Sequence, residues 1–194
     1  MRTREKPGDA CPCGLLVSRT VIAISEDEIR KSFVNCSKGE ARRLNLPKGL
    51  AELPWADLDF LGWRDPGAPD RGYLVAERGG ELVGVVLRVP QGGRRSFTKT
   101  TVCSLCLTGH PGSGVCLLAA RKAGPAGRQG NTVGTYICAD LACPLYVRGV
   151  KKPAMGGRFE ESLTQDEQIA RTLANLDLFL TKVLDDTEAA ATPR

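Results

Sequence analysis

The sequence predicts an α+β protein with short N-terminal helices, antiparallel β-hairpins, a cysteine-rich module and a C-terminal amphipathic helix. Three patterns support this fold class. Serine and threonine capping boxes mark the starts of helices, and a Gly-Gly pair separates two stretches of alternating apolar residues. Two close pairs of cysteines flank a second candidate hairpin.

The composition is that of a soluble globular protein, because 42% of the 194 residues are hydrophobic and 25% are charged. No apolar run approaches the roughly 20 residues that span a bilayer, and the N-terminus lacks the apolar core of a secretion signal. We therefore expect a cytoplasmic, monomeric protein without membrane contact. In that compartment, the eight cysteines favour metal binding and buried thiols over disulfides.

Residues 1–20 are predicted to be a disordered extension, because they carry prolines and glycines without sustained periodicity. Cys11 and Cys13 lie in this stretch, and two ligands cannot close a tetrahedral metal site. The folded α/β domain is expected over residues 21–158.

Capping boxes at residues 25–28 and 37–40 predict two short helices, since a serine and a glutamate three positions apart satisfy the first amides of a helix. Residues 54–66 then concentrate aromatic and apolar side chains, which we interpret as core. The apolar period next changes to two. Gly79 and Gly80 supply the positive φ angles of a tight turn, so a β-hairpin is predicted around them.

The cysteine module, over about residues 98–150, has the spacing of a metal site. Cys103 and Cys106 form one pair, and Cys138 and Cys143 form the other after 31 intervening residues. Four thiolates complete a tetrahedral shell, so we predict one structural Zn²⁺ bound by these cysteines. Disulfides and four free buried thiols are the alternatives.

The segments around the cysteines predict a treble-clef zinc finger. A strand over residues 98–102 leads into a knuckle turn that carries the first pair. Residues 115–121 and 131–137 are expected to pair as a hairpin around a flexible basic loop at 124–130. The last cysteine then begins a short helix that ends near Arg148.

Three further residues have metal-binding side chains. His110 is the one histidine, and because four cysteines complete the shell we expect it to be a loop residue rather than a ligand. Cys36 and Cys116 stand alone in the sequence and are predicted to be small buried side chains.

A third capping box at residues 164–167 predicts a C-terminal helix within residues 159–186 that packs on the domain. Its apolar residues recur at steps of three and four, which makes one stripe along about five turns. Phe179 and Leu184 widen the stripe and leave room for a partner surface. The stripe itself consists of Ile169, Leu173, Leu176, Leu180 and Val183. After this helix, residues 187–194 are predicted to be a disordered tail.

The sequence predicts a binding protein and not an enzyme. It has no phosphate-binding loop in a strand-to-helix context, no serine–histidine–aspartate arrangement and no HExxH helix. A zinc ion with four cysteines keeps no open position for a substrate, so its binding energy contributes to folding.

Two binding hypotheses follow, with a zinc-containing enzyme as a weaker third. In the first, a ribosome-associated module binds a translation factor through the zinc module and the last helix. In the second, the module binds RNA, because residues 101–158 carry seven basic side chains against one acidic one, and Tyr136 or Tyr146 is available for stacking. The candidate RNA-binding residues are Arg121, Lys122, Arg128, Lys151 and Lys152.

Four motifs together decide between these hypotheses. They are SFVNCSKGE from Ser32, LDFLGWRDP from Leu58, CSLC from Cys103 and GTYICAD from Gly134. In combination they resemble the C-terminal treble-clef zinc-finger domain of elongation factor G-binding proteins, the family that includes the fusidic-acid resistance proteins. The resemblance covers about residues 22–184.

This resemblance implies a protein that binds elongation factor G, promotes its release from the ribosome and has no hydrolytic activity. It also implies that the four cysteines bind zinc, and that the factor-facing surface includes Tyr136 and Phe179. With the basic residues Arg128, Lys151 and Lys152, these form the predicted set of partner-binding residues. The alternative is an rRNA-binding, ribosome-associated zinc module that does not bind the factor.

Overall fold

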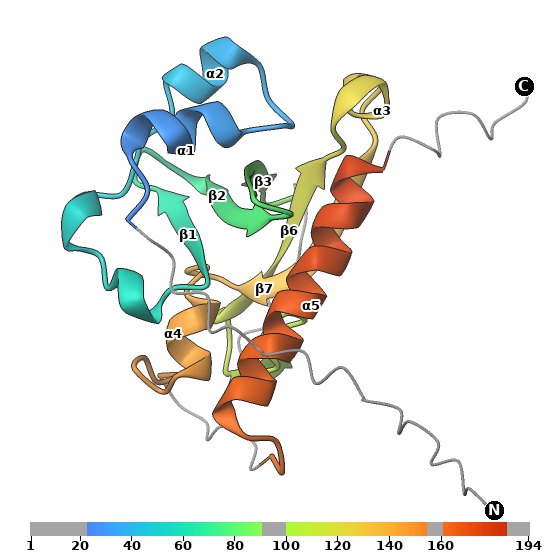
Figure 1. Ribbon diagram of the computed structural model, residues 1–194. Helices are drawn as coiled ribbons and strands as arrows, with labels where there is room; N and C mark the ends of the chain where they lie inside the picture. The colour runs from blue at the N-terminus through green and yellow to red at the C-terminus, as the bar shows by residue number, and fades with distance from the viewer. Residues whose placement is uncertain (1–22, 91–99, 155–160, 186–194) are drawn as a thin grey trace, which may run out of the picture.

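The computed structural model describes residues 23–90, 100–154 and 161–185, and it has the predicted α+β fold (Figure 1). The predicted N-terminal extension, with Cys11 and Cys13, lies outside the described residues, and so does the predicted tail at 187–194.

Both predicted N-terminal helices are present, as α1 (Glu26–Ser32) and α2 (Lys38–Arg42). In each, the N-cap serine hydroxyl accepts a hydrogen bond from the amide of the glutamate three residues later, and that carboxylate accepts one from the serine amide. Two 3₁₀ turns follow, η1 (Leu50–Glu52) and η2 (Trp55–Asp57).

The main sheet is antiparallel and has the strand order β1-β2-β3-β6-β7. The predicted Gly-Gly hairpin is confirmed, because Gly79 and Gly80 have φ angles of 61° and 86° between β2 and β3. The five strands are β1 (Phe60–Asp65), β2 (Ala68–Arg78), β3 (Glu81–Arg88), β6 (Val115–Arg121) and β7 (Thr132–Cys138).

β1 comes from the aromatic segment that the sequence identified only as core. Its pairing begins at Phe60 opposite Ala76, and its side chains alternate between the two faces of the sheet. Charged residues at Arg64 and Asp65 interrupt the apolar pattern, which explains why periodicity did not reveal this strand.

The two faces of the sheet carry two separate apolar clusters. Leu74 and Ala76 face a cluster that includes the cysteines and the C-terminal helix, whereas Tyr73 and Val75 face one built with the N-terminal helices. This alternation along β2 follows from the two-residue period of a strand. Both faces are therefore buried, and the central strands are apolar on each side.

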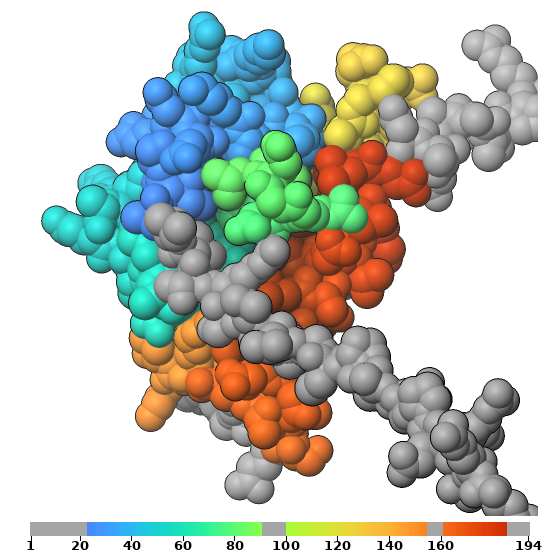
Figure 2. All heavy atoms as spheres, in the orientation of Figure 1, coloured from blue at the N-terminus to red at the C-terminus, as the bar shows by residue number. Residues whose placement is uncertain are grey.

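The predicted C-terminal helix is α5 (Gln165–Leu184), and it begins at the predicted threonine cap. It lies across β6 and β7 (Figure 1) and buries part of its apolar stripe, including Leu176, Leu180 and Val183. At the tip of the first hairpin, Arg78 Nε donates to Asp177 Oδ1 of α5 at 2.6 Å. Figure 2 shows this hairpin, in green, between the N-terminal helices, in blue, and α5, in red. Among the described helices, none is both long and apolar enough to cross a membrane.

Candidate metal centre

The cysteine module has the predicted order of knuckle, hairpin and helix. Of the strand predicted over residues 98–102, the structure describes residues 100–102, and Thr101–Val102 form β4, which pairs with β5 (Gly109–His110). The hairpin is formed by β6 and β7, with the predicted pairing. The closing helix is α4 (Cys143–Val147).

Backbone hydrogen bonds fix the first cysteine pair. The amide of Leu107 donates to the Cys103 carbonyl at 3.0 Å, and the amide of Cys103 donates to the Thr108 carbonyl at 3.0 Å. The knuckle is also attached to β7, because the amide of Ser104 donates to the Tyr136 carbonyl at 2.7 Å. The position of the first pair is therefore set by the hairpin that carries the second.

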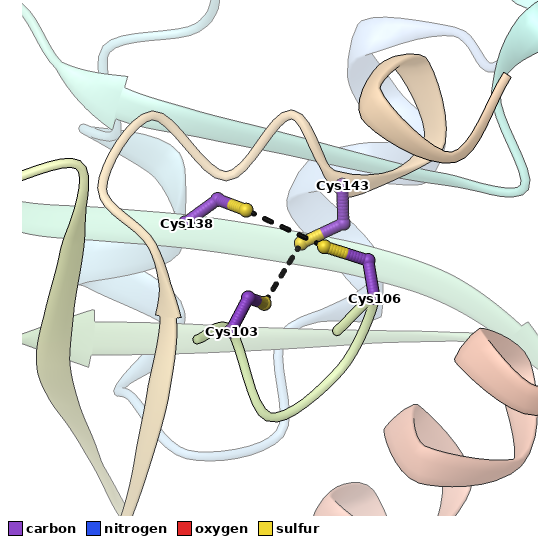
Figure 3. Close-up of side chains that lie close together, drawn as sticks. All are labelled: Cys103, Cys106, Cys138 and Cys143. Atoms are coloured by element: carbon purple, nitrogen blue, oxygen red, sulfur yellow. Dashed lines mark hydrogen bonds between the residues drawn. The ribbon is translucent and has the colours of Figure 1, made fainter. Parts of the chain in front are cut away.

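The second cysteine pair is held by the turn between β7 and α4. The amide of Leu141 donates to the Cys138 carbonyl at 2.9 Å, and Leu141 adopts the left-handed conformation with φ 61°. Cys143 is the first residue of α4. This compact turn brings both sulfur atoms to the same side of the chain (Figure 3).

The four sulfur atoms lie within 4.8 Å of one another, and all four side chains are buried (Figure 3). The Sγ–Sγ distance is 3.7 Å for Cys103 and Cys143 and 3.5 Å for Cys106 and Cys138. A tetrahedral zinc with Zn–S bonds of about 2.3 Å separates its sulfurs by about 3.8 Å. In a disulfide, by contrast, the two sulfur atoms are only about 2.05 Å apart. The donor set and its spacing fit one zinc ion, and the cysteines are not disulfide-bonded.

Without a metal ion, the four neighbouring thiols shift one another's pKa values in opposite directions. Burial and hydrogen bonds from the neighbouring thiols raise the pKa of Cys143, and hydrogen bonds with Cys103 and Cys106 raise the pKa of Cys138. Hydrogen bonds from the other three thiols lower the pKa of Cys103, so the ionised form of one sulfur is favoured at the expense of others. A divalent cation removes this competition, because it stabilises all four thiolates together.

His110 lies beside the cluster, and the prediction of a loop histidine is wrong. It is a buried residue of β5, and its Nε2 lies 3.4 Å from Cys138 Sγ. Its ring packs edge-on against Tyr146, with 4.6 Å between ring centroids. Burial lowers the pKa of His110, which favours a neutral ring able to donate a hydrogen bond to a thiolate.

A polar network surrounds the second pair. Asp140 accepts hydrogen bonds from the Tyr146 hydroxyl at 2.9 Å, from Lys151 Nζ at 2.6 Å and from the Ala142 amide at 3.2 Å. Burial opposes ionisation of Asp140, but these three donors outweigh it and lower its pKa. The carboxylate thereby joins the turn, α4 and the segment after α4.

β1 supports the same turn from the other side, which the sequence did not indicate. A Cβ atom on Gly62 would lie 2.5 Å from the Leu141 carbonyl oxygen, so only glycine allows this close approach. Next to the start of β1, the guanidinium of Arg148 donates to both carboxylate oxygens of Asp59, and both side chains are largely buried. A glycine inside an aromatic strand is the sequence signal that could have revealed this contact.

The predicted partner-binding residues differ in their exposure. Tyr136 is 52% exposed on β7, and Arg128 and Lys152 are exposed as well. Lys151 is exposed but forms the ion pair with Asp140. Phe179 is only 6% exposed and packs in the core, so its side chain does not form part of the outer surface of α5.

Other expectations for this region need correction. The loop predicted at residues 124–130 contains the short helix α3 (Gly124–Arg128), whose first turn includes Pro125 and whose Ala126 is buried. Proline is favourable in the first turn of a helix. The three glycines of the segment led to the prediction of a flexible loop instead. Cys36 and Cys116 are half-buried rather than buried.

Comparison with protein families gives a match over most of the chain. Residues 28–183 match the FBP C-terminal treble-clef zinc-finger family. This range contains all four clustered cysteines and α5 up to its last turn. No curated protein matches the sequence.

Comparison with solved structures gives a similar fold at low sequence identity. The fusidic acid resistance protein FusC superimposes with a TM-score of 0.54 and 15% identity. The match covers 84% of this chain and 60% of the FusC chain. At this identity the likeness concerns the fold, and the present chain spans about three fifths of the length of that protein.

Proposed function

Because this chain belongs to the FBP C-terminal treble-clef zinc-finger family, we propose that it is a zinc-containing protein that binds translation elongation factor G, alone or on the ribosome. The zinc is structural in this proposal, since four buried cysteines fill its coordination shell. The ion holds the knuckle, the hairpin and α4 together, and the surface that they present makes the contact.

The exposure of Tyr136 is the observation that carries the proposal. Tyr136 is 52% exposed on a strand that is hydrogen-bonded to the knuckle, and aromatic residues are enriched in protein interfaces. Val102, 40% exposed, lies two residues before the amide that is bonded to Tyr136. The two side chains belong to adjacent segments of the zinc module.

The charges of the module favour a protein partner over RNA. Of the five basic residues that the RNA hypothesis requires, Lys122 is buried and Lys151 is paired with Asp140. Arg148 is paired with Asp59. Arg121, Arg128 and Lys152 stay exposed, and three such residues suit a few contacts with an acidic protein surface better than the row of phosphate contacts that RNA requires.

The direct test is complex formation between this chain and purified elongation factor G at moderate salt, measured by size-exclusion chromatography. We expect a stoichiometric complex that Tyr136→Ala weakens at least tenfold while metal content is retained. Leu178→Ala is the matched control, because Leu178 is 61% exposed on α5. Loss of the complex in Leu178→Ala but not in Tyr136→Ala would contradict the proposed face, and binding to isolated rRNA alone would contradict factor binding.

Release of the factor from the ribosome is a separate step with a separate test. A chain that promotes release should raise the tolerance of a fusidic-acid-sensitive host when expressed there, and Tyr136→Ala should abolish the gain. Unchanged tolerance, together with an intact complex in solution, would limit the function to binding.

A further inference from the structure

A cavity of about 690 Å³ lies between the N-terminal helices and one end of the sheet, and none of the clustered cysteines lines it. Its walls come from the segment between α1 and α2, from α2 and the segment after it, from the β1–β2 turn, and from β2, β3, β6 and the start of β7. Cavities of roughly 300–1,000 Å³ are typical of sites for small organic molecules.

The side chain of Asn35 connects two of the strands that line this cavity, β3 and β6. β3 and β6 pair at only two positions, Leu87 with Ala120 and Arg88 with Ala119. Asn35 bridges the same two strands: its Nδ2 donates to the carbonyls of Val86 and Arg121, both at 3.0 Å, and its Oδ1 accepts from the Val86 amide at 2.8 Å. The part of the wall formed by β3 and β6 is therefore fixed by hydrogen bonds within the protein.

The cavity is rich in arginine. Two carboxylates, Glu40 and Asp65, also line it, which gives the lining residues a net charge of +2. Within the described part of the chain, no ion pair joins any of these arginines to a carboxylate. The four arginines are Arg43, Arg71, Arg88 and Arg121.

The two carboxylates are already engaged by other donors. Asp65 accepts hydrogen bonds from the Tyr73 hydroxyl at 2.6 Å, from Asn45 Nδ2 at 2.9 Å and from the Gly67 amide at 2.8 Å. Glu40 serves the capping box of α2, and it is the hydrogen bonds from this box, with a smaller contribution from the nearby arginines, that lower its pKa. Arg71 also interacts with the Tyr73 side chain, and the remaining arginine donors stay available for an incoming anion.

Two of the arginines are placed unfavourably for stability. Arg71 and Arg88 are directly opposite each other in the β2–β3 pairing, where like charges repel. In addition, Nε of Arg71 is buried without a hydrogen-bond partner among the described residues. A buried donor without an acceptor is unfavourable, and an anion in the cavity would relieve both the repulsion and the missing hydrogen bond.

We propose that this cavity binds a small organic molecule that carries a phosphate group. The planar guanidinium group matches the oxygens of phosphate with two parallel hydrogen bonds, and several arginines together favour its multiple charges. Leu44, Val86 and Pro90 line the same cavity and offer an apolar wall to the organic part of the ligand. This site is independent of the factor-binding face around Tyr136.

The test is an NMR titration of the zinc-loaded full chain with inorganic pyrophosphate, ADP and adenosine, followed at the Arg71 Nε–H and Asn45 side-chain signals. We expect saturable shifts with pyrophosphate, tighter binding with ADP, and no saturable shift with adenosine. Arg88→Gln should weaken binding at least tenfold, because one charge-assisted contact is lost. Arg121→Gln should act similarly and serves as the second variant if the first does not fold.

The matched control is Arg42→Gln, which removes an exposed arginine that does not line the cavity. It should change the affinity less than twofold. Equal weakening in Arg42→Gln and Arg88→Gln would show general charge attraction and overturn the site. The absence of saturable shifts with pyrophosphate up to 10 mM, roughly the weakest affinity of interest, would overturn it too, as would equal binding of adenosine and ADP.

Discussion

Each clustered cysteine contributes one sulfur atom, and its local backbone decides where that atom lies. Among the described residues other than glycine, two have a left-handed backbone: Leu107 directly follows the first cysteine pair, and Leu141 lies within the second. An unstrained chain would carry glycine at such positions. At position 141 the chain has leucine instead, and its side chain is fully buried beside the cysteine cluster. The packing of this side chain compensates for the strained backbone conformation.

Replacement of a ligand tests the metal centre at this scale. In Cys138→Ser we expect zinc content to fall from one equivalent per chain to near zero, because a serine hydroxyl does not ionise near neutral pH. The protein should also lose several kcal/mol of stability, since structural zinc contributes about 10 kcal/mol or more of binding energy to such folds. Metal analysis and chemical denaturation measure the two effects.

Cys116→Ser provides the matched control, because Cys116 is half-buried on β6 and does not belong to the cluster. It should keep its zinc. Native protein purified without metal, or a Cys138→Ser variant with unchanged metal content, would contradict the assignment of the cluster as a zinc site.

Among the elements, β1 has the largest influence that the sequence did not reveal. It adds a strand to the first hairpin and at the same time packs its Gly62 against the turn between the second pair of cysteines. The buried pair of Asp59 and Arg148 ties the start of this strand to the end of α4. β1 is thus joined to the cysteine turn and to α4 by contacts that do not involve the metal.

Gly62→Ala should destabilise the protein by about 2 kcal/mol or more, because the new Cβ would overlap the Leu141 carbonyl oxygen and neither backbone can yield easily. Gly39→Ala is the matched control. A Cβ at Gly39 in α2 meets nothing closer than 3.9 Å, and alanine favours the helix by about 0.5–1 kcal/mol. Urea denaturation of the two variants should give shifts of opposite sign. Equal effects would disprove the close approach.

For the whole molecule, hydrogen-bonded carboxylates connect elements that are far apart in sequence. Asp65 joins β1 to β2 through Tyr73 and to the segment after α2 through Asn45. Burial opposes its ionisation, but these hydrogen bonds outweigh it and lower the pKa of Asp65. Local hydrogen bonds lower the pKa of four other carboxylates in the same way: Asp140 and the capping-box residues Glu28, Glu40 and Glu167.

The lowered pKa values predict a loss of stability in acid. Because the folded protein binds these protons less readily than the unfolded chain, the stabilisation is complete above the unfolded value of about 4 and is lost as the pH falls below it. Denaturation at several pH values between 3 and 6 should show this decline. Asp65→Asn should be less stable near neutral pH and decline less in acid, whereas the exposed Asp70→Asn should follow the parent protein. A parallel decline in Asp65→Asn would refute this role.

Local interactions made much of this protein predictable from its sequence alone. The capping boxes, the Gly-Gly turn and the two cysteine pairs each involve residues a few positions apart. These local motifs were sufficient to predict the helix starts, the first hairpin and the metal centre. The α+β class followed from their order along the chain.

Other features were decided only by tertiary structure. Phe179 and Leu178 are neighbours on α5, yet Phe179 is buried and Leu178 is exposed. Successive side chains of a helix point about 100° apart, so the side of the helix that packs against the sheet determines which of the two is buried. β1 needed β2 as a partner, and the opposition of Arg71 and Arg88 arises only from strand register. Such contacts join distant segments, and no local pattern encodes their geometry.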